Sequence, residues 1–263
     1  MNRLNTLFSN KNNDILSVYF TAGFPYRDSA ASIIKALDSK GVDMIEVGIP
    51  FSDPMADGKT IQNSSTIALR NGMTLALLLD QVREARQSSP DIPLVLMGYL
   101  NPIIQYGPEN LFKTCKEIGI DALIIPDLPF AEYLSDYKEM CRKYDIPMIM
   151  LITPETSDER IHLIDEHCDG FIYMVSAAAT TGTRDSFGDG QHAYFNRIDA
   201  LQLQHPRLIG FGISNPSTFA DACAHSSGAI IGSKFIKCLE AHPDSPDKAV
   251  DELLCAIGKR QNE

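Results

Sequence analysis

The sequence has 263 residues, of which 44% are hydrophobic and 22% are charged, so it contains enough apolar material for a sizeable folded core. Its formal net charge of -11 opposes the phosphate backbone of nucleic acid and any anionic membrane surface, so we expect neither as a partner. Residues 1–13 are polar and no later apolar run approaches about 18 residues, which predicts a cytoplasmic protein without a signal peptide or a membrane span.

Eight short apolar runs recur along the chain, with longer mixed segments between them. Each run is rich in Val, Ile, Leu or Met, as expected of strands that are covered on both faces of a parallel sheet. The runs are ILSVYFTAG from Ile15, MIEVGIP from Met44, LVLMGYL from Leu94, ALIIPDL from Ala122, PMIMLIT from Pro147, GFIYMVS from Gly170, RLIGFGI from Arg207 and GAIIGS from Gly228. We therefore predict eight strands.

The segments between the strands carry apolar residues at spacings of three and four, which is typical of amphipathic helices. The clearest stripes are Ile33, Ile34 and Leu37, then Ile61, Ala68 and Leu69, then Leu111, Phe112 and Cys115. Asn215 before Pro216 predicts the start of a later helix, and Thr156 with Glu159 has the spacing of a capping box.

Strands that alternate with helices eight times favour a closed (β/α)8 barrel, the TIM barrel. The rival is an open doubly wound sheet, which usually carries a G-x-G-x-x-G turn after its first strand, whereas the first strand here ends in TAGFP. We expect one TIM-barrel catalytic domain over 1–263. A short amphipathic segment over 3–8 is expected to form an extra N-terminal helix that closes the bottom of the barrel.

The end of the second strand carries the strongest candidates for catalysis, because active sites of TIM barrels lie at the C-terminal ends of the strands. Alternation along this strand turns Glu46 toward the barrel axis, where burial would raise its pKa toward neutrality and suit it to acid–base chemistry. A structural carboxylate satisfied by hydrogen bonds is an equally good interpretation of its position. In the following loop, FSDPMADGKTIQ, Asp53 and Asp57 lie in Asp-Pro and Asp-Gly pairs, which are more often turn residues.

Three glycine-containing turns follow the last three strands, at 180–183, at 210–214 and at Gly232-Ser233. Glycine turns and helix N-termini offer free amides to an anion, and the final strand ends are the usual phosphate position in TIM barrels. We therefore expect a small phosphate-bearing substrate.

Other chemistries find less support in the sequence. A Schiff-base aldolase needs an inward lysine on a strand, yet Lys59 and Lys234 lie in or just beyond loops. Metal-assisted chemistry has only Glu46, Asp53 and Asp57 as grouped oxygen ligands. The six histidines lack the i,i+4 spacing of a common metal pair, and the six cysteines form no Cys-x-x-Cys pair, so we expect no metal site.

The segment MIEVGIPFSDPMADGKTIQ resembles the signature segment of tryptophan synthase α subunits. The resemblance continues in the same order through TAGFP, LMGYLNP, PDLP, TTGTR, GFGIS and AIIGS and covers nearly the whole chain. It implies a lyase that splits indole-3-glycerol phosphate into indole and glyceraldehyde 3-phosphate by retro-aldol cleavage. It also implies that indole passes to a β subunit for tryptophan synthesis.

The same resemblance assigns roles to individual residues. It implies that Glu46 and Asp57 are catalytic and that Tyr173 lines the indole pocket. It further implies that the phosphate is bound by Gly182, Gly212, Gly232 and Ser233. By resemblance, the chain needs no cofactor, pyridoxal phosphate belongs to the partner β subunit, and the two subunits form an αββα heterotetramer.

Some residues depart from the family pattern or leave questions about the loops. Lys59 stands where proline is frequent, and 176–179 (Ser-Ala-Ala-Ala) replaces a more glycine-bearing loop start. Nothing in the sequence identifies an anchor for the loop 51–58, so we expect a β subunit to order it.

Two alternative functions remain: a barrel that only activates its partner, and a different phosphate-sugar lyase or isomerase. Neither explains why both carboxylates of the 46–57 segment are retained.

Overall fold

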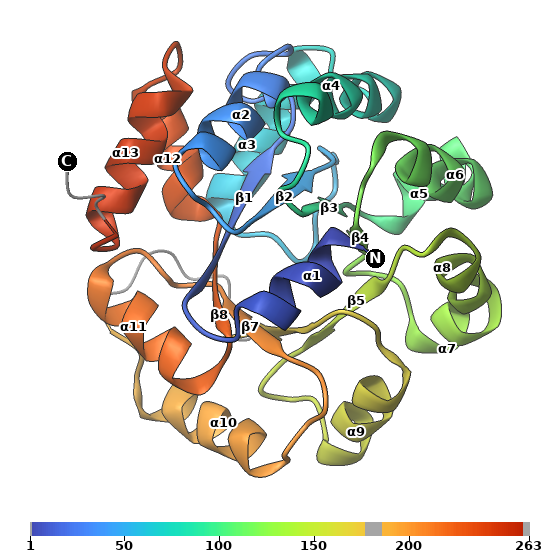
Figure 1. Cartoon of the computed structure of the whole chain (residues 1–263), viewed down its shortest axis with the longest axis vertical. Coiled ribbons are helices and arrows are strands. Elements are labelled where there is room, and N and C mark those ends of the chain that lie inside the picture. Colours follow the sequence, from blue (N-terminus) through green and yellow to red (C-terminus); the bar gives the residue numbers. More distant parts are fainter. Residues whose placement is uncertain (1, 177–185, 260–263) are drawn as a thin grey trace.

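The computed structural model describes residues 2–176 and 186–259, and in these ranges eight parallel strands close into a barrel in chain order. Figure 1 shows the strands around the centre, with the helices outside them. The strands are β1 (Ile15–Thr21), β2 (Met44–Gly48), β3 (Leu94–Met97), β4 (Ala122–Ile124), β5 (Met148–Ile152), β6 (Ile172–Val175), β7 (Arg207–Gly210) and β8 (Gly228–Ile231). β1 pairs with both β2 and β8, so the predicted TIM barrel is confirmed.

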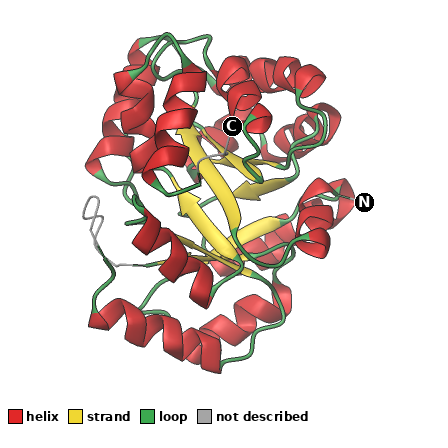
Figure 2. Ribbon diagram, turned by 60° about the vertical axis from the view of Figure 1, so that its left-hand side comes forward, coloured by secondary structure: helices red, strands yellow, loops and turns green. Residues whose placement is uncertain are grey.

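Helices surround the strands on the outside, as Figure 2 shows. They are α2 (Ala30–Ser39), α3 (Lys59–Arg70), α4 (Leu75–Ser88), α5 (Leu100–Tyr106), α6 (Pro108–Ile118), α7 (Phe130–Glu132), the π-helix η1 (Tyr133–Tyr137), α8 (Lys138–Tyr144), α9 (Asp158–His167), α10 (Asp189–Ala200), α11 (Pro216–His225), α12 (Ser233–Ala241) and α13 (Pro246–Ala256). The predicted start at Asn215-Pro216 is confirmed, since the Asn215 side chain caps α11.

Two details of the predicted helices are wrong. Leu69 is 38% exposed, because α3 turns Ile61 and Ala68 to the core and leaves Leu69 beside that face. The cap of α9 is Ser157, one residue after the predicted Thr156, and its side chain accepts from the backbone of the first turn. The Thr156 hydroxyl accepts instead from the backbone N–H of the preceding turn.

Two apolar layers fill the molecule, one inside the barrel and one between the strands and the helices. Alternation along β2 divides its side chains between them: Met44 belongs to the inner layer, and Ile45 and Val47 belong to the outer layer. The predicted inward direction of Glu46 follows from the same alternation and is confirmed, because Glu46 lines a cavity together with Tyr173 of the inner layer.

Helix α1 (Arg3–Asn10) closes the bottom of the barrel, as the amphipathic segment predicts. Leu4 is fully buried among the inner-layer residues, and the ring of Phe8 lies 5.6 Å from that of Phe171. Asn2 caps the helix by accepting from the Leu4 N–H. This helix therefore excludes water from the end of the barrel opposite the strand termini that carry function.

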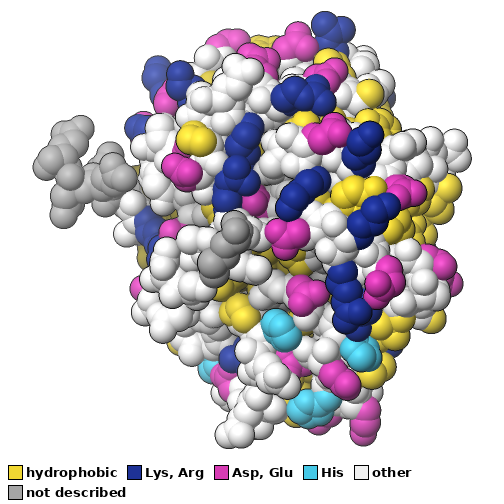
Figure 3. Space-filling view, turned by 45° about the vertical axis from the view of Figure 1, so that its right-hand side comes forward, with side chains coloured by type: hydrophobic (Ala, Val, Ile, Leu, Met, Phe, Trp, Pro, Cys, Tyr) yellow, Lys and Arg dark blue, Asp and Glu magenta, His cyan; other side chains and the backbone are white. Residues whose placement is uncertain are grey.

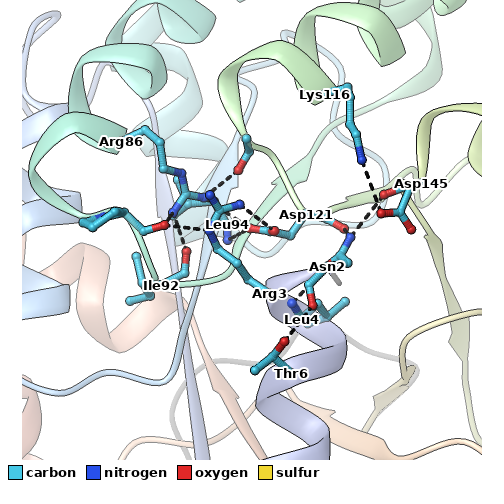
Figure 4. Close-up of polar contacts among 12 residues, drawn as sticks. Asn2, Arg3, Leu4, Thr6, Arg86, Ile92, Leu94, Lys116, Asp121 and Asp145 are labelled. Atoms are coloured by element: carbon cyan, nitrogen blue, oxygen red, sulfur yellow. Dashed lines mark hydrogen bonds and ion pairs between the residues drawn. The ribbon is translucent and has the colours of Figure 1, made fainter.

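A buried carboxylate joins α1 to the barrel, as Figure 4 shows. Asp121 follows α6, and its side chain binds Arg3 at 3.1 Å and Arg86 at 3.2 Å. It also accepts from the Leu94 N–H at the start of β3. Both carboxylate oxygens are therefore paired, which offsets the desolvation of a side chain that is 3% exposed.

The outer surface carries charges of both signs. On the face in Figure 3, Lys and Arg side chains are interspersed with Asp and Glu. Within the ranges that the structure describes, none of the helices has the length and apolar character that crossing a membrane requires.

Replacing Asp121 by Ala leaves the guanidinium of Arg86, which is 11% exposed, without its carboxylate partner. We expect the free energy of unfolding in urea to fall by about 3–5 kcal/mol, because an unpaired charge would remain in a dry environment. The control is Asp80→Ala, which removes an exposed ion pair with Arg83 within α4 and should cost less than about 1 kcal/mol. Equal losses in the two variants would contradict this account of the network.

Candidate active site

A cavity of about 230 Å³ opens at the C-terminal ends of the strands, where the sequence analysis places the site. It is lined by Tyr19, Glu46, Asp57, Gly58, Lys59, Thr60, Ile61, Met97, Tyr173, Phe211, Gly212, Ile213, Ile230, Gly232, Ser233 and Lys234. All the predicted site residues in the described ranges are among them. Gly182 lies outside the described residues.

Glu46 is the buried acid of this cavity. Its side chain is fully buried, and the Ser17 hydroxyl donates to Oε1 at 2.9 Å. Oε2 has no hydrogen-bond partner among the described residues. Burial raises the pKa of Glu46 from 4.5 to about 8, against the smaller opposing effect of the Ser17 hydrogen bond. Glu46 therefore holds a proton at neutral pH, and an oxygen without a partner remains available to a ligand.

Two tyrosine rings share the barrel interior with Glu46, and two strand glycines make room for them. A Cβ at Gly48 would overlap the hydroxyl of Tyr19, and a Cβ at Gly210 would overlap that of Tyr173. Both tyrosines are buried, at 9% and 4% exposure. These glycines are therefore required by close approach, and Tyr173 lines the same cavity as Glu46.

Asp57 lies half-buried in the loop between β2 and α3. Burial raises its pKa from 3.8 to about 6, and a hydrogen bond with the Tyr99 hydroxyl opposes that rise. At neutral pH, Asp57 is therefore mostly ionised while Glu46 is mostly protonated. The two carboxyl groups of one cavity thus hold different charge states, as an acid–base pair requires.

The loop 51–58 has an internal anchor, which the sequence analysis does not identify. The Tyr99 ring, just beyond β3, stacks on Phe51 with centroids 5.2 Å apart. The Tyr99 hydroxyl accepts from the Ala56 N–H at 3.0 Å. The expectation of a loop without an anchor in this chain is therefore wrong, because the neighbouring strand supplies one.

The cavity residues that follow β7 and β8 offer donors to an anion. Gly212 has φ +78°, a backbone conformation that favours glycine. Gly232 is the N-cap of α12 and Ser233 is its first residue, and Gly232 has no side chain to bind the first amides. Lys59 and Lys234 also line the cavity, and the Lys234 ammonium lies 3.6 Å from Glu252 Oε1 of α13. Free amides at a helix N-terminus and ammonium groups are both suited to phosphate.

Sequence reasoning misses Tyr19, Tyr99 and the position of the two lysines in the cavity. Tyr19 is two residues before the end of β1 and faces inward by the alternation that identifies Glu46, so it could have been found. Tyr99 follows β3 within the motif LMGYLNP, and its contact with a loop more than 40 residues away gives no local signal.

The fold and cavity define a class of protein before any comparison is made. A closed (β/α)8 barrel holds a protonated glutamate, an ionised aspartate and an anion-binding wall at the C-terminal ends of its strands. This combination is typical of a TIM-barrel enzyme that works by acid–base chemistry.

Comparisons with known proteins identify the family. The family model of the tryptophan synthase alpha chain matches residues 6–263. A tryptophan synthase alpha chain from Parabacteroides distasonis is 60% identical over 98% of this chain and 99% of its own length. One from Phocaeicola vulgatus is 58% identical with the same coverage. The crystal structure of the Legionella pneumophila alpha chain is 32% identical, with a TM-score of 0.86 over 98% of this chain and 96% of that chain.

The chain therefore belongs to the tryptophan synthase alpha chain family, as the signature segment indicates. It is the lyase subunit that cleaves indole-3-glycerol phosphate to indole and glyceraldehyde 3-phosphate and passes indole to a β subunit. The alternative of a different phosphate-sugar enzyme on this fold is thereby excluded.

Replacing Tyr99 by Phe keeps the ring that stacks on Phe51 and removes the hydroxyl that binds the Ala56 N–H. We expect faster amide hydrogen exchange over 51–58 and turnover about tenfold lower. The reason is that the Ala56 N–H and the Asp57 carboxylate each lose a hydrogen bond, and a typical hydrogen bond contributes on the order of 1 kcal/mol.

Tyr26→Phe is the matched control, because it removes an exposed hydroxyl that binds Asp244. It should change neither hydrogen exchange in the loop nor turnover. Unchanged exchange over 51–58 in Tyr99→Phe would show that the hydroxyl does not anchor the loop.

Proposed function

We propose that Glu46 and Asp57 together perform the retro-aldol cleavage of indole-3-glycerol phosphate in this chain. One observation carries the proposal: the fully buried Glu46 carboxyl, with an oxygen that has no partner among the described residues, faces the same cavity as Asp57. A buried acid without a partner is costly to a fold, so a catalytic task accounts for it better than a structural one.

The first step is proton transfer from the Glu46 carboxyl to C3 of the indole ring. A pKa of about 8 keeps this proton on Glu46 at neutral pH and makes Glu46 a suitable general acid. Protonation at C3 places positive charge on the ring, mainly at the indole nitrogen. The ring can then accept the electron pair of the bond to the glycerol chain.

The second step breaks the carbon–carbon bond. The Glu46 carboxylate removes the proton of the hydroxyl next to that bond, the oxygen forms the aldehyde of glyceraldehyde 3-phosphate, and the bonding pair restores the aromatic ring of indole. Glu46 ends the cycle protonated, so no external acid or base is consumed. Asp57 accepts from the indole N–H, and its negative charge stabilises the cationic ring.

The remaining wall residues position the substrate. Tyr173, with Met97 and Ile230, offers an apolar surface to the indole ring. The phosphate is assigned to the amides at Gly212 and Gly232 and to Ser233, together with Gly182. The two ends of the substrate are thus assigned to different residues of one cavity, with the bond to be broken near Glu46.

The partner of this lyase is a β subunit, and we propose the αββα heterotetramer as their assembly. A similar structure, 26% identical, is described as tryptophan synthase from Mycobacterium tuberculosis in an aminoacrylate-bound form. Met55, 93% exposed on the loop 51–58, offers apolar surface to a partner at this end of the barrel. The chain is proposed to act as one cytoplasmic domain without a cofactor of its own. Sedimentation of the mixed subunits tests the assembly.

Glu46→Gln should abolish indole release while leaving the circular dichroism spectrum unchanged. The amide keeps the shape of the side chain but can neither donate nor accept the reacting proton, and a general acid–base group contributes roughly 100- to 10,000-fold in rate. The assay is indole release from indole-3-glycerol phosphate by the purified chain, with and without a β subunit.

Asp53→Asn is the matched control, because Asp53 is exposed in the same loop as Asp57 and lies outside the cavity. It should retain the wild-type turnover of the chain assayed without a β subunit. If Glu46→Gln retained more than about a tenth of the wild-type turnover, the assignment of Glu46 would be wrong.

The pH dependence of kcat/KM should be bell-shaped. Activity is expected to fall below about pH 6, where Asp57 takes up a proton, and above about pH 8, where Glu46 loses its proton. Asp57→Asn should lower the rate of the chemical step and abolish the acidic limb while preserving the alkaline limb. An acidic limb that survives in Asp57→Asn would assign that ionisation to another group.

A further inference from the structure

A group of metal-ligating side chains lies on the outer helices, away from the catalytic cavity. His192 is in the first turn of α10, and Asp221 and His225 are one turn apart on α11. One candidate ligand atom from each lies within 4.8 Å of the other two, and all three residues are half-buried. The sequence analysis, which searched for two histidines at i,i+4 spacing, misses this group. The i,i+4 pair here is Asp221 with His225, and His192 comes from the neighbouring helix α10.

The spacing of these ligand atoms fits a small divalent ion. His192 Nε2 lies 3.4 Å from Asp221 Oδ2. With bonds of about 2.0–2.1 Å, two ligand atoms in a tetrahedral zinc site are about 3.3–3.4 Å apart. The ligand atom of His225 lies within 4.8 Å of both, and water would complete the four ligands.

The surroundings of His225 orient it for metal binding. Its Nδ1 lies 2.7 Å from Asp199 Oδ2, and since a carboxylate only accepts, Nδ1–H donates and the lone pair of Nε2 stays free. Asp199 is held in turn by Arg207 at 3.1 Å. A carboxylate behind a ligating histidine is the usual outer shell of a zinc site, where it fixes the ring and raises its basicity.

Packing beneath the group holds the two imidazoles in place. Phe195 is fully buried, and its ring centroid lies 6.2 Å from that of His192 and 5.5 Å from that of His225. The two imidazole centroids are 6.1 Å apart. The rings are thus arranged by the core and need little ordering when an ion binds.

A second group of similar composition lacks these features. The carboxylate oxygens of Asp165 already accept from the backbone N–H groups of Gln204 and His205 and from the His205 ring. Burial raises the pKa of the Cys168 thiol to about 12, so this thiol stays protonated at neutral pH. The carboxylate oxygens of this second group are therefore already paired, and their hydrogen bonds link α9 to the segment before β7. This group provides a control.

We propose that His192, Asp221 and His225 form a zinc site that joins α10 to α11, with Asp199 as the positioning residue behind His225. Two imidazoles and one carboxylate with an open fourth position are a known ligand set of Zn²⁺, and the 3.4 Å between His192 Nε2 and Asp221 Oδ2 fits its tetrahedral geometry. The site is independent of the catalytic residues, so its test does not depend on cleavage of indole-3-glycerol phosphate.

The experiment titrates ZnCl₂ into the full chain after treatment with EDTA, using isothermal titration calorimetry in a buffer without phosphate. We expect one saturable site per chain, at least tenfold weaker in His225→Gln and in His192→Gln. Asp199→Asn should weaken binding by about 10- to 100-fold, as for other outer-shell carboxylates. His205→Gln, in the second group, should bind zinc as the wild type does.

Two further measurements make the outcome decisive. Co²⁺ in place of zinc should give the strong visible absorption of a four-coordinate ion, and zinc should raise the melting temperature of the wild type but not of His225→Gln. All variants should keep their circular dichroism spectra and indole release, since these side chains lie outside the cavity. No saturable binding, or binding that is equal in wild type and His225→Gln, would overturn the proposal.

Discussion

The closed barrel keeps the Glu46 carboxyl from water, with the Ser17 hydroxyl as its one hydrogen-bond partner among the described residues, and the function of the chain depends on this constraint. Because burial raises the pKa of Glu46 to about 8, the folded chain holds a proton that the unfolded chain releases above about pH 4.5. Stability therefore falls as pH rises between these two values. The raised pKa therefore makes the free energy of folding less favourable at neutral pH, and it keeps on Glu46 the proton that is transferred in the reaction.

The two ends of the barrel treat polar groups in opposite ways. At the bottom, Asp121 has partners for both oxygens and α1 covers the inner apolar layer, so this end contributes stability. At the top, Glu46 Oε2 has no partner among the described residues, and the first amides of α12 receive no side-chain cap. The free oxygen of Glu46 and these amides border the cavity, so a substrate can satisfy them. This division matches the general separation of stability and activity in TIM barrels.

Coupling between neighbouring strands gives the cavity its shape. Because β2 pairs with β3, the loop after β2 lies beside Tyr99, which orders it from within the chain. Gly48 and Gly210 likewise shape the cavity, because the rings of Tyr19 and Tyr173 occupy the space where a Cβ would lie. A β subunit that activates this chain would thus bind a loop that already has an anchor. We expect the β subunit to adjust the position of Asp57 more than to order the loop 51–58.

The sequence by itself determined the eight strands, the inward direction of Glu46 and the helix that closes the barrel, because these depend on periods of two and of three to four residues along a continuous segment. The signature segment also determined the family. Tertiary structure decided the anchoring of Asp57 by Tyr99, the two lysines in the cavity wall and the approach of His192 to His225. Each of these brings together residues from separate strand–helix units, and their distance is set only when the barrel closes. Local periodicity carries no information about such distances.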